Sequence, residues 1–272
     1  MALKFRLILA TLIFLSSCVS SEVTTPVVPP TPIDTPRPII TAAPDDTGWQ
    51  TLQPGLDYRE LRVKMEERSD RLRMARVDPS KLQLRVWYDP HQPRQVSAWL
   101  NSTSALLVVN GNYFDPQYQA LGLIISEGVT AGRVHEGFGG TLAIGENLVK
   151  VRANVVEPYQ SGEGLRYALQ NFPMLVLPGG QANDGIEDNQ QRAPRTAVAQ
   201  DRSGRIVFVV SPLTLFTLTE FGQWLAASDL DLDAALNLDG GTSSGLLVRG
   251  PDRIVGVDSW VNVPSVIAVE VR

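Results

Sequence analysis

The stretch Ala234-Ala235-Leu236-Asn237-Leu238-Asp239-Gly240-Gly241-Thr242-Ser243-Ser244-Gly245 has the pattern of a strand that ends in a glycine-rich turn. Leu236 and Leu238 alternate with Asn237 and Asp239, as expected for strand side chains, which alternate with a period of two. The glycines let a ligand approach the backbone closely. A carboxylate, a carboxamide and several hydroxyls therefore meet at a strand end, which suits a polar or phosphorylated ligand. Taken alone, the Asp-Gly pair favours a simple hairpin turn, so the rest of the chain must decide.

Two known motifs overlap this region without matching it fully. The segment Gly241-Thr242-Ser243-Ser244-Gly245 fits the G-x-S-x-G pattern of serine hydrolases, but strand-like residues follow it and no histidine comes later. Asp229, Asp231 and Asp233 have the spacing of a calcium loop, but the positions that require glycine and glutamate hold alanine and glycine. We therefore predict neither a nucleophilic Ser243 nor a calcium loop.

The composition favours a globular protein that does not bind nucleic acid. The chain has 272 residues, of which 43% are hydrophobic, enough for one large domain or two small ones. Its net charge is −5 and no basic run is present, so a nucleic-acid partner is not predicted. His91 and His135 do not form a zinc pattern. We predict no cofactor, and a structural divalent cation remains an open alternative.

The first eighteen residues have the pattern of a secretory signal peptide. Lys4 and Arg6 precede the apolar run 7–15, which is shorter than the ~20 residues that a membrane-spanning helix needs. Leu15-Ser16-Ser17-Cys18 resembles the lipobox of bacterial lipoproteins, and Cys18 is the only cysteine in the chain. We expect lipidation at Cys18, export, and anchoring on the outer side of the cytoplasmic membrane or in the outer membrane. A plain signal peptide is the alternative.

The next segment, residues 19–47, is rich in proline and threonine and has almost no apolar periodicity. Proline fixes φ and this composition cannot bury a core, so the segment is predicted to be a disordered linker. Such a linker would hold a folded domain away from a membrane. The predicted organisation is a lipoprotein signal peptide at 1–18, the linker at 19–47 and one folded domain at 48–272.

Strand patterns outnumber helix patterns in the folded domain. The clearest predicted strands are 72–77, 82–88, 105–109, 206–210 and 265–271, and the stretch 169–177 is apolar around Pro173. One helix is predicted around 96–100, and a second follows Thr217, where Thr217 and Glu220 match a capping box. Hairpins predominate over alternating βαβ units. We predict an α+β fold, a single domain of mostly antiparallel or mixed sheets with a few packed helices.

Three further residues carry groups suited to catalysis or binding. Asn110 follows the apolar run 105–109, although Asn-Gly also favours a plain turn. Arg195 has the planar guanidinium fork that binds phosphate well. Glu220 is either a second acid or only the capping residue of its helix. Glycosidic cleavage needs at least one well-placed carboxylate, and Asp239 is the best placed. Residues 183–192 form a long polar loop, of a type that is often functional.

Seven segments between Leu82 and Val271 form an ordered set of short motifs: Val109-Asn110-Gly111-Asn112-Tyr113-Phe114, Gly122 with Glu127-Gly128, Gln170-Asn171-Phe172-Pro173-Met174-Leu175, Pro194-Arg195-Thr196-Ala197-Val198-Ala199, Thr217 to Glu220, Ala235-Leu236-Asn237-Leu238-Asp239-Gly240-Gly241-Thr242-Ser243, and Pro264-Ser265-Val266-Ile267. With these motifs in this order, the chain from Leu82 to Val271 resembles the phosphodiester glycosidase domain family. Asn112 and Ala199 stand where that family usually has glycine.

This resemblance implies a hydrolase, a glycosidase that cleaves a sugar-1-phosphodiester of the GlcNAc-1-phosphodiester type in the cell envelope. On this basis Asp239 is the predicted nucleophile or base, and Arg195 and Thr196 are predicted to hold the phosphate. Asn110 and Asn237 are predicted to orient the sugar or Asp239. Further donors to the substrate are predicted in the turn: Gly240, Gly241, Thr242 and Ser243.

The implied substrate is a sugar-phosphate glycoconjugate or an envelope polysaccharide, and the implied membrane contact is made through the N-terminal lipid. The same residues also fit an alternative, a non-catalytic lipoprotein that binds cell-wall material or polysaccharide. The two functions differ in one observable, because only the first predicts turnover of a sugar phosphodiester.

Acyl labelling tests the predicted lipid anchor. We expect the expressed full chain to incorporate a labelled fatty acid and its processing to be blocked by globomycin, because Cys18 would become the lipidated N-terminus. Recovery of a soluble product that carries no lipid would contradict this prediction.

Overall fold

The computed structural model describes residues 44–272 of the chain. The predicted signal peptide, Cys18 and most of the predicted linker lie outside these residues. Strand pairing begins with a bridge between Asp46 and Leu61, just before the predicted start of the folded domain. Among the described residues, no helix is both long enough and apolar enough to cross a membrane.

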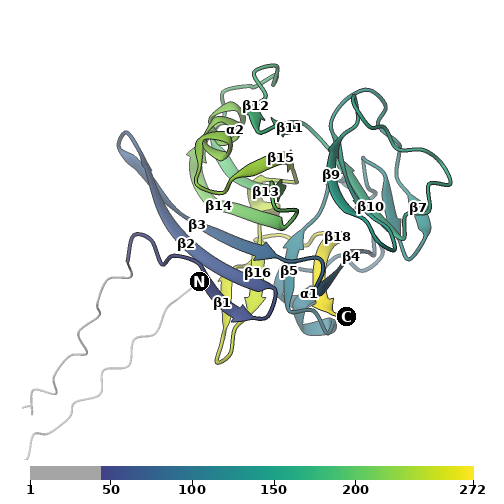
Figure 1. Ribbon diagram of the computed structural model, residues 1–272, viewed down its shortest axis with the longest axis horizontal. Coiled ribbons are helices and arrows are strands. Elements are labelled where there is room, and N and C mark those ends of the chain that lie inside the picture. Colours follow the sequence, from purple (N-terminus) through teal and green to yellow (C-terminus); the bar gives the residue numbers. More distant parts are fainter. Residues whose placement is uncertain (1–43) are drawn as a thin grey trace, which may run out of the picture. The chain divides into compact units, whose positions relative to one another are not determined.

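The largest sheet has eight strands, and every neighbouring pair in it is antiparallel. Strands β2 and β3 form a long hairpin that extends away from the other strands in Figure 1. The order across the sheet is β1 (Gln50–Gln53), β2 (Leu56–Met65), β3 (Arg68–Val77), β14 (Ile206–Phe216), β13 (Ala193–Asp201), β15 (Leu232–Asn237), β11 (Met174–Leu177) and β12 (Gln181–Ala182).

Two five-stranded sheets, also antiparallel throughout, complete the β structure. The β10 sheet has the order β7 (Val129–Ala131), β6 (Ile124–Ser126), β10 (Tyr167–Asn171), β8 (Gly140–Ile144) and β9 (Val149–Ala153). The β5 sheet has the order β17 (Ile254–Val257), β16 (Leu246–Arg249), β5 (Leu107–Asn110), β18 (Ser265–Val271) and β4 (Leu82–Tyr88).

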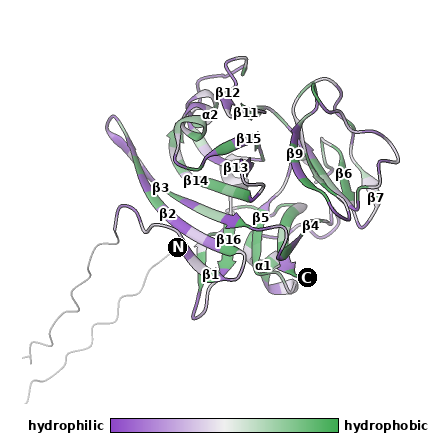
Figure 2. Ribbon diagram, in the orientation of Figure 1, coloured by the Kyte–Doolittle hydropathy of each residue, from purple (hydrophilic) through white to green (hydrophobic). Residues whose placement is uncertain are grey.

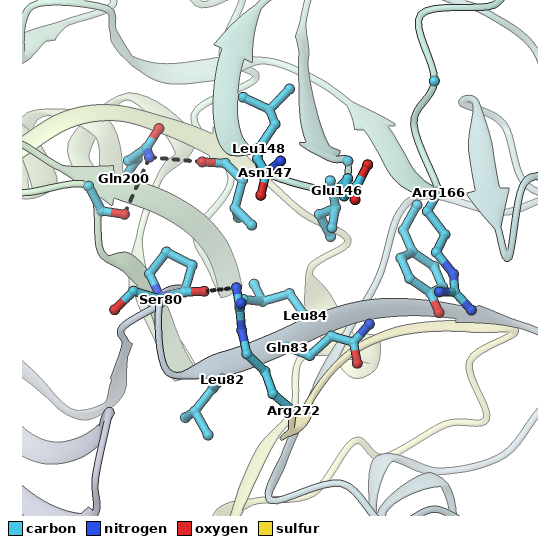
Figure 3. A pocket seen from close by; sticks show the side chains of 17 residues that line it. Ser80, Leu82, Gln83, Leu84, Glu146, Asn147, Leu148, Arg166, Gln200 and Arg272 are labelled. Carbon is cyan, nitrogen blue, oxygen red and sulfur yellow. Dashed lines mark hydrogen bonds between the residues drawn. The ribbon is translucent and has the colours of Figure 1, made fainter.

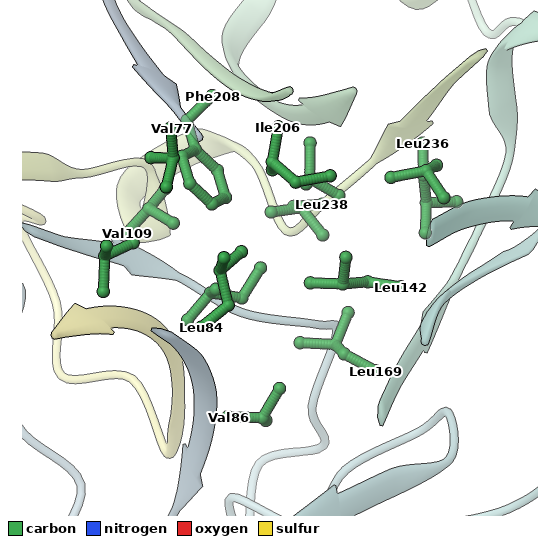
Figure 4. Packing of buried hydrophobic residues seen from close by; sticks show 14 of the residues in the cluster. Val77, Leu84, Val86, Val109, Leu142, Leu169, Ile206, Phe208, Leu236 and Leu238 are labelled. Atoms are coloured by element: carbon green, nitrogen blue, oxygen red, sulfur yellow. The ribbon is translucent and has the colours of Figure 1, made fainter. Parts of the chain in front are cut away.

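Side chains from all three sheets meet in one hydrophobic core (Figure 4). Phe208 and Leu236 come from the eight-stranded sheet, Leu142 and Leu169 from the β10 sheet, and Leu84 from the β5 sheet. Burial of this apolar surface is the main driving force that holds the sheets together. In Figure 2 the hydrophobic colour follows the core strands, whereas the tip of the β2–β3 hairpin is hydrophilic.

Two α-helices cover outer faces of the sheets. Helix α1 (Val96–Ser102) buries Val96, Trp99 and Leu100 against the β5 sheet. Helix α2 (Leu218–Ala227) buries Phe221 and Leu225 against the eight-stranded sheet. Among residues 44–272 only a short 3-10 helix, η1 (Gly241–Ser243), adds to these, so the fold is dominated by antiparallel sheet rather than by an even mixture of helix and strand.

Most sequence-derived elements are confirmed, and the exceptions have physical reasons. The apolar stretch 169–177 contributes to two strands, because Pro173 separates β10 from β11 and the two strands lie in different sheets. Strand β2 was not predicted, because its buried face includes the charged Arg59, which breaks the apolar alternation. That guanidinium binds the carboxylates of Asp46 and Asp229.

The capping box at the start of α2 gives a test of local stability. The Thr217 side chain accepts from the Glu220 N–H at 3.2 Å, and Glu220 accepts from the Thr217 N–H at 2.8 Å. We expect Thr217→Ala to lower the free energy of unfolding by about 1 kcal/mol, because an N-terminal N–H of the helix loses its partner. Thr217→Ser, measured in the same urea titration, should keep most of this stability; equal losses in both variants would contradict the capping role.

Candidate active site

Asp239 lies where strands of two sheets converge, directly after β15. The antiparallel pairing of Ala197 with Asn237 continues in a hydrogen bond from the Leu238 N–H to the Thr196 carbonyl at 2.9 Å. The N–H of Asp239 then donates to the carbonyl of Gly111, after β5, at 3.0 Å. The main chain of Asp239 is therefore attached to both β13 and β5.

The carboxamide of Asn110 fixes this junction. Its Nδ2 donates to the Asp239 carbonyl at 2.7 Å, and its Oδ1 accepts from Thr196 Oγ1 at 3.0 Å and from the Gly245 N–H at 3.1 Å. Asn110 is fully buried. Of the two predicted roles, orienting the sugar or orienting Asp239, the observed contacts are those of the second.

The prediction that Thr196 holds phosphate does not agree with its position. Thr196 is fully buried, and its hydroxyl hydrogen is directed to Asn110 Oδ1. Thr196 and Arg195 are neighbours on β13 and therefore point to opposite faces of the strand. Arg195 is therefore the one that is free to face a ligand, whereas the Thr196 hydroxyl holds the carboxamide of Asn110 in place.

The side chain of Asp239 is half-buried, and its carboxyl has few polar partners. Its Oδ1 accepts from the Gly240 N–H at 2.9 Å, and the Ser243 side chain makes a further hydrogen bond to it. Burial raises the pKa of Asp239 to about 6, and these two hydrogen bonds oppose the shift. A carboxyl with this pKa exchanges protons near neutral pH, which suits a nucleophile or a base.

Arg195 precedes Thr196 on β13, at the end of this strand where the pairing with Asn237 and Leu238 brings it close to the start of the glycine-rich turn. Its Nη2 donates to the Gln191 carbonyl at 2.6 Å and its Nε to the Phe216 carbonyl at 3.4 Å. Among residues 44–272, no carboxylate lies within 4.0 Å of this guanidinium. Burial lowers the pKa of Arg195. A half-buried guanidinium without an acidic partner is a suitable site for an anion such as phosphate.

Tyr113 is a site residue that the sequence interpretation did not single out. Its hydroxyl accepts from Asn237 Nδ2 at 2.6 Å. Burial raises the pKa of Tyr113 to about 12; the charge of Asp239 adds to this shift and that of Arg195 opposes it. The phenol therefore lies within electrostatic reach of both groups. Its place in the Asn110–Phe114 segment was the only sequence signal available.

The glycine-rich turn uses some of its donors internally. The Gly240 N–H binds Asp239 itself, and the Ser243 N–H donates to the Gly240 carbonyl at 3.2 Å. The turn was predicted to donate hydrogen bonds to the substrate, but these two N–H groups already bind acceptors within the protein. Thr242 is exposed, and Gly241 adopts a φ of 59°, which glycine tolerates without strain. Strand β16 follows the turn, whereas a nucleophile elbow requires a helix there.

Glu220 lies on α2 with its carboxylate already engaged. It accepts from Arg192 Nη2 at 2.7 Å and closes the capping box with Thr217. Burial opposes its ionisation, but these hydrogen bonds outweigh burial and lower the pKa of Glu220 below its usual value. These contacts match the capping interpretation, so we assign Glu220 no part in the chemistry.

The predicted loop 183–192 borders the site. Its Gln191 carbonyl binds Arg195, and its Asp188 accepts from the Thr219 N–H at 2.8 Å, which attaches the loop to the start of α2. The aspartates of the calcium-like segment lie elsewhere and bind protein groups: Asp229 pairs with Arg59, Asp231 with Arg202, and Asp233 accepts from the Gly179 N–H.

A large cavity in the described part of the chain does not contain Asp239. It has a volume of about 1070 Å³ and is lined by Leu82, Leu84, Gln200 and Arg272, among others (Figure 3). Gln200 is five residues from Arg195 on β13, so the cavity lies about 16 Å further along this strand. The polar groups predicted for the site are thus gathered at one end of the strands and this cavity at the other.

The chain is similar to known proteins in sequence and in structure. A family model described as phosphodiester glycosidase matches residues 103–270. The auto-inhibited catalytic domain of zebrafish N-acetylglucosamine-1-phosphodiester alpha-N-acetylglucosaminidase superposes with a TM-score of 0.65 and 18% identity, over 85% of this chain and 87% of that one. A hypothetical protein from Synechocystis has a TM-score of 0.60 and 17% identity, over 85% and 64% of the two chains. No curated protein sequence matches significantly.

Burial of Asp239 predicts a pH-dependent stability difference. Folding raises its pKa from 3.8 to about 6, so the folded chain holds this proton more tightly than the unfolded chain. Its contribution to stability is therefore present below pH ~4 and is lost as pH rises through ~6. Asp239→Asn lacks this titration, so we expect it to be more stable than the parent by about 1–3 kcal/mol at pH 8 and nearly equal at pH 4.

Urea denaturation of both proteins at the two pH values measures this difference, because titrating groups shared by both cancel. An Asn variant that is less stable than the parent at pH 8 would contradict the proposed cost of burying the carboxylate.

Proposed function

Because the chain belongs to the phosphodiester glycosidase family, we propose that it hydrolyses a sugar-1-phosphodiester and releases the sugar and a phosphomonoester. One observation carries the proposal: the Tyr113 phenol lies within electrostatic reach both of Asp239, a carboxyl with a pKa near 6, and of Arg195, a half-buried guanidinium with no carboxylate within 4.0 Å in the described chain. The carboxyl suits attack at a sugar carbon, and the guanidinium suits the phosphate that leaves.

The bond that breaks joins C1 of the sugar to a phosphate oxygen, and its electron pair leaves with the phosphate. A phosphate monoester is a weak base, so protonation of the leaving group is needed less than in ordinary glycoside hydrolysis. Arg195 would stabilise the charge that develops on the phosphate. This accounts for a site with one carboxyl and one guanidinium, in which Glu220 is committed to α2.

Asp239 acts as nucleophile or as the base that activates water. As nucleophile its carboxylate forms a bond to C1, which water later replaces; as base it accepts the proton of the attacking water. In both cases water supplies the hydroxyl at C1. Both roles need the ionised form, which predominates above pH ~6. Asn110 keeps the backbone of Asp239 in place by its hydrogen bond to the Asp239 carbonyl. The hydrogen-bonded pair of Tyr113 and Asn237 is next to it.

The predicted export and lipid anchor would place this activity at the cell envelope, where polysaccharides and glycoconjugates contain sugar phosphodiesters. A non-catalytic polysaccharide-binding lipoprotein is the second candidate, favoured by the rings of Tyr113 and Phe172, which pack 5.1 Å apart next to Asn237. The two candidates are separated by turnover.

Release of N-acetylglucosamine from UDP-GlcNAc or an alkyl GlcNAc-1-phosphodiester tests the activity of the full chain in detergent. We expect Asp239→Asn to reduce turnover by at least about a thousandfold and Arg195→Ala by about a hundredfold or more. Arg195→Lys should recover part of the loss, because lysine keeps the charge but not the bidentate fork.

Glu220→Gln is the matched control, since glutamine also completes a capping box, and it should turn over substrate like the parent protein. The pH profile of kcat/KM should fall below pH ~6 as Asp239 becomes protonated. Unchanged turnover in Asp239→Asn would refute the assignment, and binding of glycans without turnover of any sugar phosphodiester would establish the second candidate.

A further inference from the structure

The β5 sheet has an outer face that α1 covers only in part. In β4, Leu84 and Val86 enter the core shared by the three sheets, so Arg85 and Trp87, which alternate with them, lie on the opposite face. Helix α1 packs on that face mainly over β5 and β16, whereas β4 is the edge strand of the sheet. The outer side of β4 therefore borders α1 without being covered by it.

A cavity of about 580 Å³ lies on this outer side of β4. We refer to it as the Trp87 cavity; it is lined by Trp87 of β4, Glu270 of β18 and Trp99 of α1, among others. Its volume is within the range of about 300–1,000 Å³ that is usual for small-molecule sites. It shares no residue with the cavity in Figure 3, and neither Asp239 nor Arg195 lines it.

The charged groups of the Trp87 cavity are paired with one another. Nη2 of Arg94 lies 3.2 Å from Oδ2 of Asp89, and Nε of Arg85 lies 2.9 Å from Oε2 of Glu270. Arg85 also contacts Glu127 through Nη1 at 2.6 Å. Both guanidinium groups thus already have carboxylate partners. Because an ionic ligand gains most from an uncompensated charge of opposite sign, the cavity favours a neutral ligand.

Two polar groups of the Trp87 cavity have no hydrogen-bond partner in residues 44–272. One is the buried Nε1–H of Trp87; by contrast, Trp99 donates its Nε1–H to the Val263 carbonyl at 3.0 Å. The other is the carboxylate of Glu270, which is 8% exposed and whose contact with Arg85 lacks the alignment of a hydrogen bond. Such groups are rare in folded proteins and indicate a place for a bound molecule.

A neutral sugar ring has the groups that complement this lining. Its hydroxyls donate to a carboxylate such as Glu270 and accept from an indole N–H, and its C–H face packs on aromatic surface. The guanidinium of Arg94 lies 4.7 Å from the ring centroid of Trp99, so the aromatic surface that remains is that of Trp87. A purely apolar ligand would leave Glu270 and the Trp87 N–H without partners, which costs free energy.

We propose that the Trp87 cavity binds a neutral sugar ring, with Trp87 donating to one hydroxyl and Glu270 accepting from another. Such a site would attach the protein to a glycan without cleaving it. The inference does not depend on the proposed hydrolysis, because Asp239, Arg195 and Tyr113 do not line the cavity.

NMR of the indole N–H groups tests the proposal on the full chain in detergent. The chain has five tryptophans, and Trp87→Phe identifies the signal of Trp87. The probes are the methyl glycosides of glucose, galactose, mannose and N-acetylglucosamine. We expect at least one of them to shift the Trp87 signal, because its N–H gains an acceptor, and to shift the Trp99 signal less, because that N–H is already bonded.

Calorimetry with the probe that binds measures the contribution of each group. We expect Trp87→Ala to raise Kd about tenfold or more, and Trp87→Phe to raise it less, because phenylalanine keeps an aromatic ring but has no N–H. Glu270→Gln should also raise Kd, since a neutral amide accepts weaker hydrogen bonds than a carboxylate. Trp260→Ala is the matched control: it removes a 76% exposed indole outside the cavity and should leave Kd unchanged.

Three results would overturn the inference. The first is that none of the four methyl glycosides shifts the Trp87 signal. The second is tighter binding of methyl glucuronide or glucosamine than of methyl glucoside, which would assign the cavity to an anion or a cation. The third is an unchanged Kd in both Trp87→Phe and Glu270→Gln, two variants chosen because they alter the side chains least.

Asp239→Asn separates the Trp87 cavity from the proposed active site. We expect this variant to bind the methyl glycoside with the Kd of the parent protein. Loss of binding in Asp239→Asn but not in Trp87→Phe would place the sugar at Asp239 and refute the present inference. Binding that depends on Trp87 in a protein that turns over no sugar phosphodiester would refute only the proposed function.

Discussion

The carboxamide of Asn110 is bonded to three separate parts of the chain: the Asp239 carbonyl, the Thr196 hydroxyl and the Gly245 N–H. It is fully buried, so breaking any of these bonds would leave a polar group without water or protein partner, at a cost of about 1–3 kcal/mol. The bonds at Asp239 and Gly245 fix both ends of the glycine-rich turn. Thr196 connects the same point to the eight-stranded sheet. The path of the chain on both sides of Asp239 thus depends on one side chain.

A fixed path allows the site to keep two ionisable groups that are unfavourable for stability. Asp239 is placed where burial raises its pKa, and Arg195 is placed where burial lowers its pKa more than the charges of Tyr113 and Asp188 raise it. In a more flexible site, side chains or water would rearrange and remove both shifts. Sheet strands that end in buried hydrogen bonds resist such rearrangement, and preorganised charges of this kind are the largest contribution to catalysis in many enzymes. Burying these two ionisable groups lowers the free energy of unfolding, and the hydrophobic core shared by three sheets offsets this loss.

The local patterns of the sequence were sufficient to predict most strands, both helices and the capping box, because each depends on neighbouring residues. The alternation of Leu236 and Leu238 with Asn237 correctly separates core from site. Contacts between distant residues were not predictable in this way. Nothing near Thr196 in sequence indicates that its hydroxyl binds a residue 86 positions earlier, and nothing near Trp260 indicates that it lies beside Thr242. The family resemblance indicated which segments form the site, but the role of each residue within them depends on packing.

The period of two in a strand explains how adjacent residues of the same segment obtained different roles. On β13, Thr196 points to the interior and binds Asn110, while its neighbour Arg195 points to the opposite face and remains without an acidic partner in the described chain. At the end of β15 and just beyond it, Leu238 enters the core, while Asn237 binds Tyr113 and Asp239 lies within electrostatic reach of the same phenol. Each segment therefore supplies one buried residue that stabilises the fold, Thr196 or Leu238, and one neighbour on the opposite face, Arg195 or Asp239. Shifting either strand by a single residue would exchange these positions, so the register of the β13–β15 ladder is what keeps Arg195 and Asp239 out of the hydrophobic core.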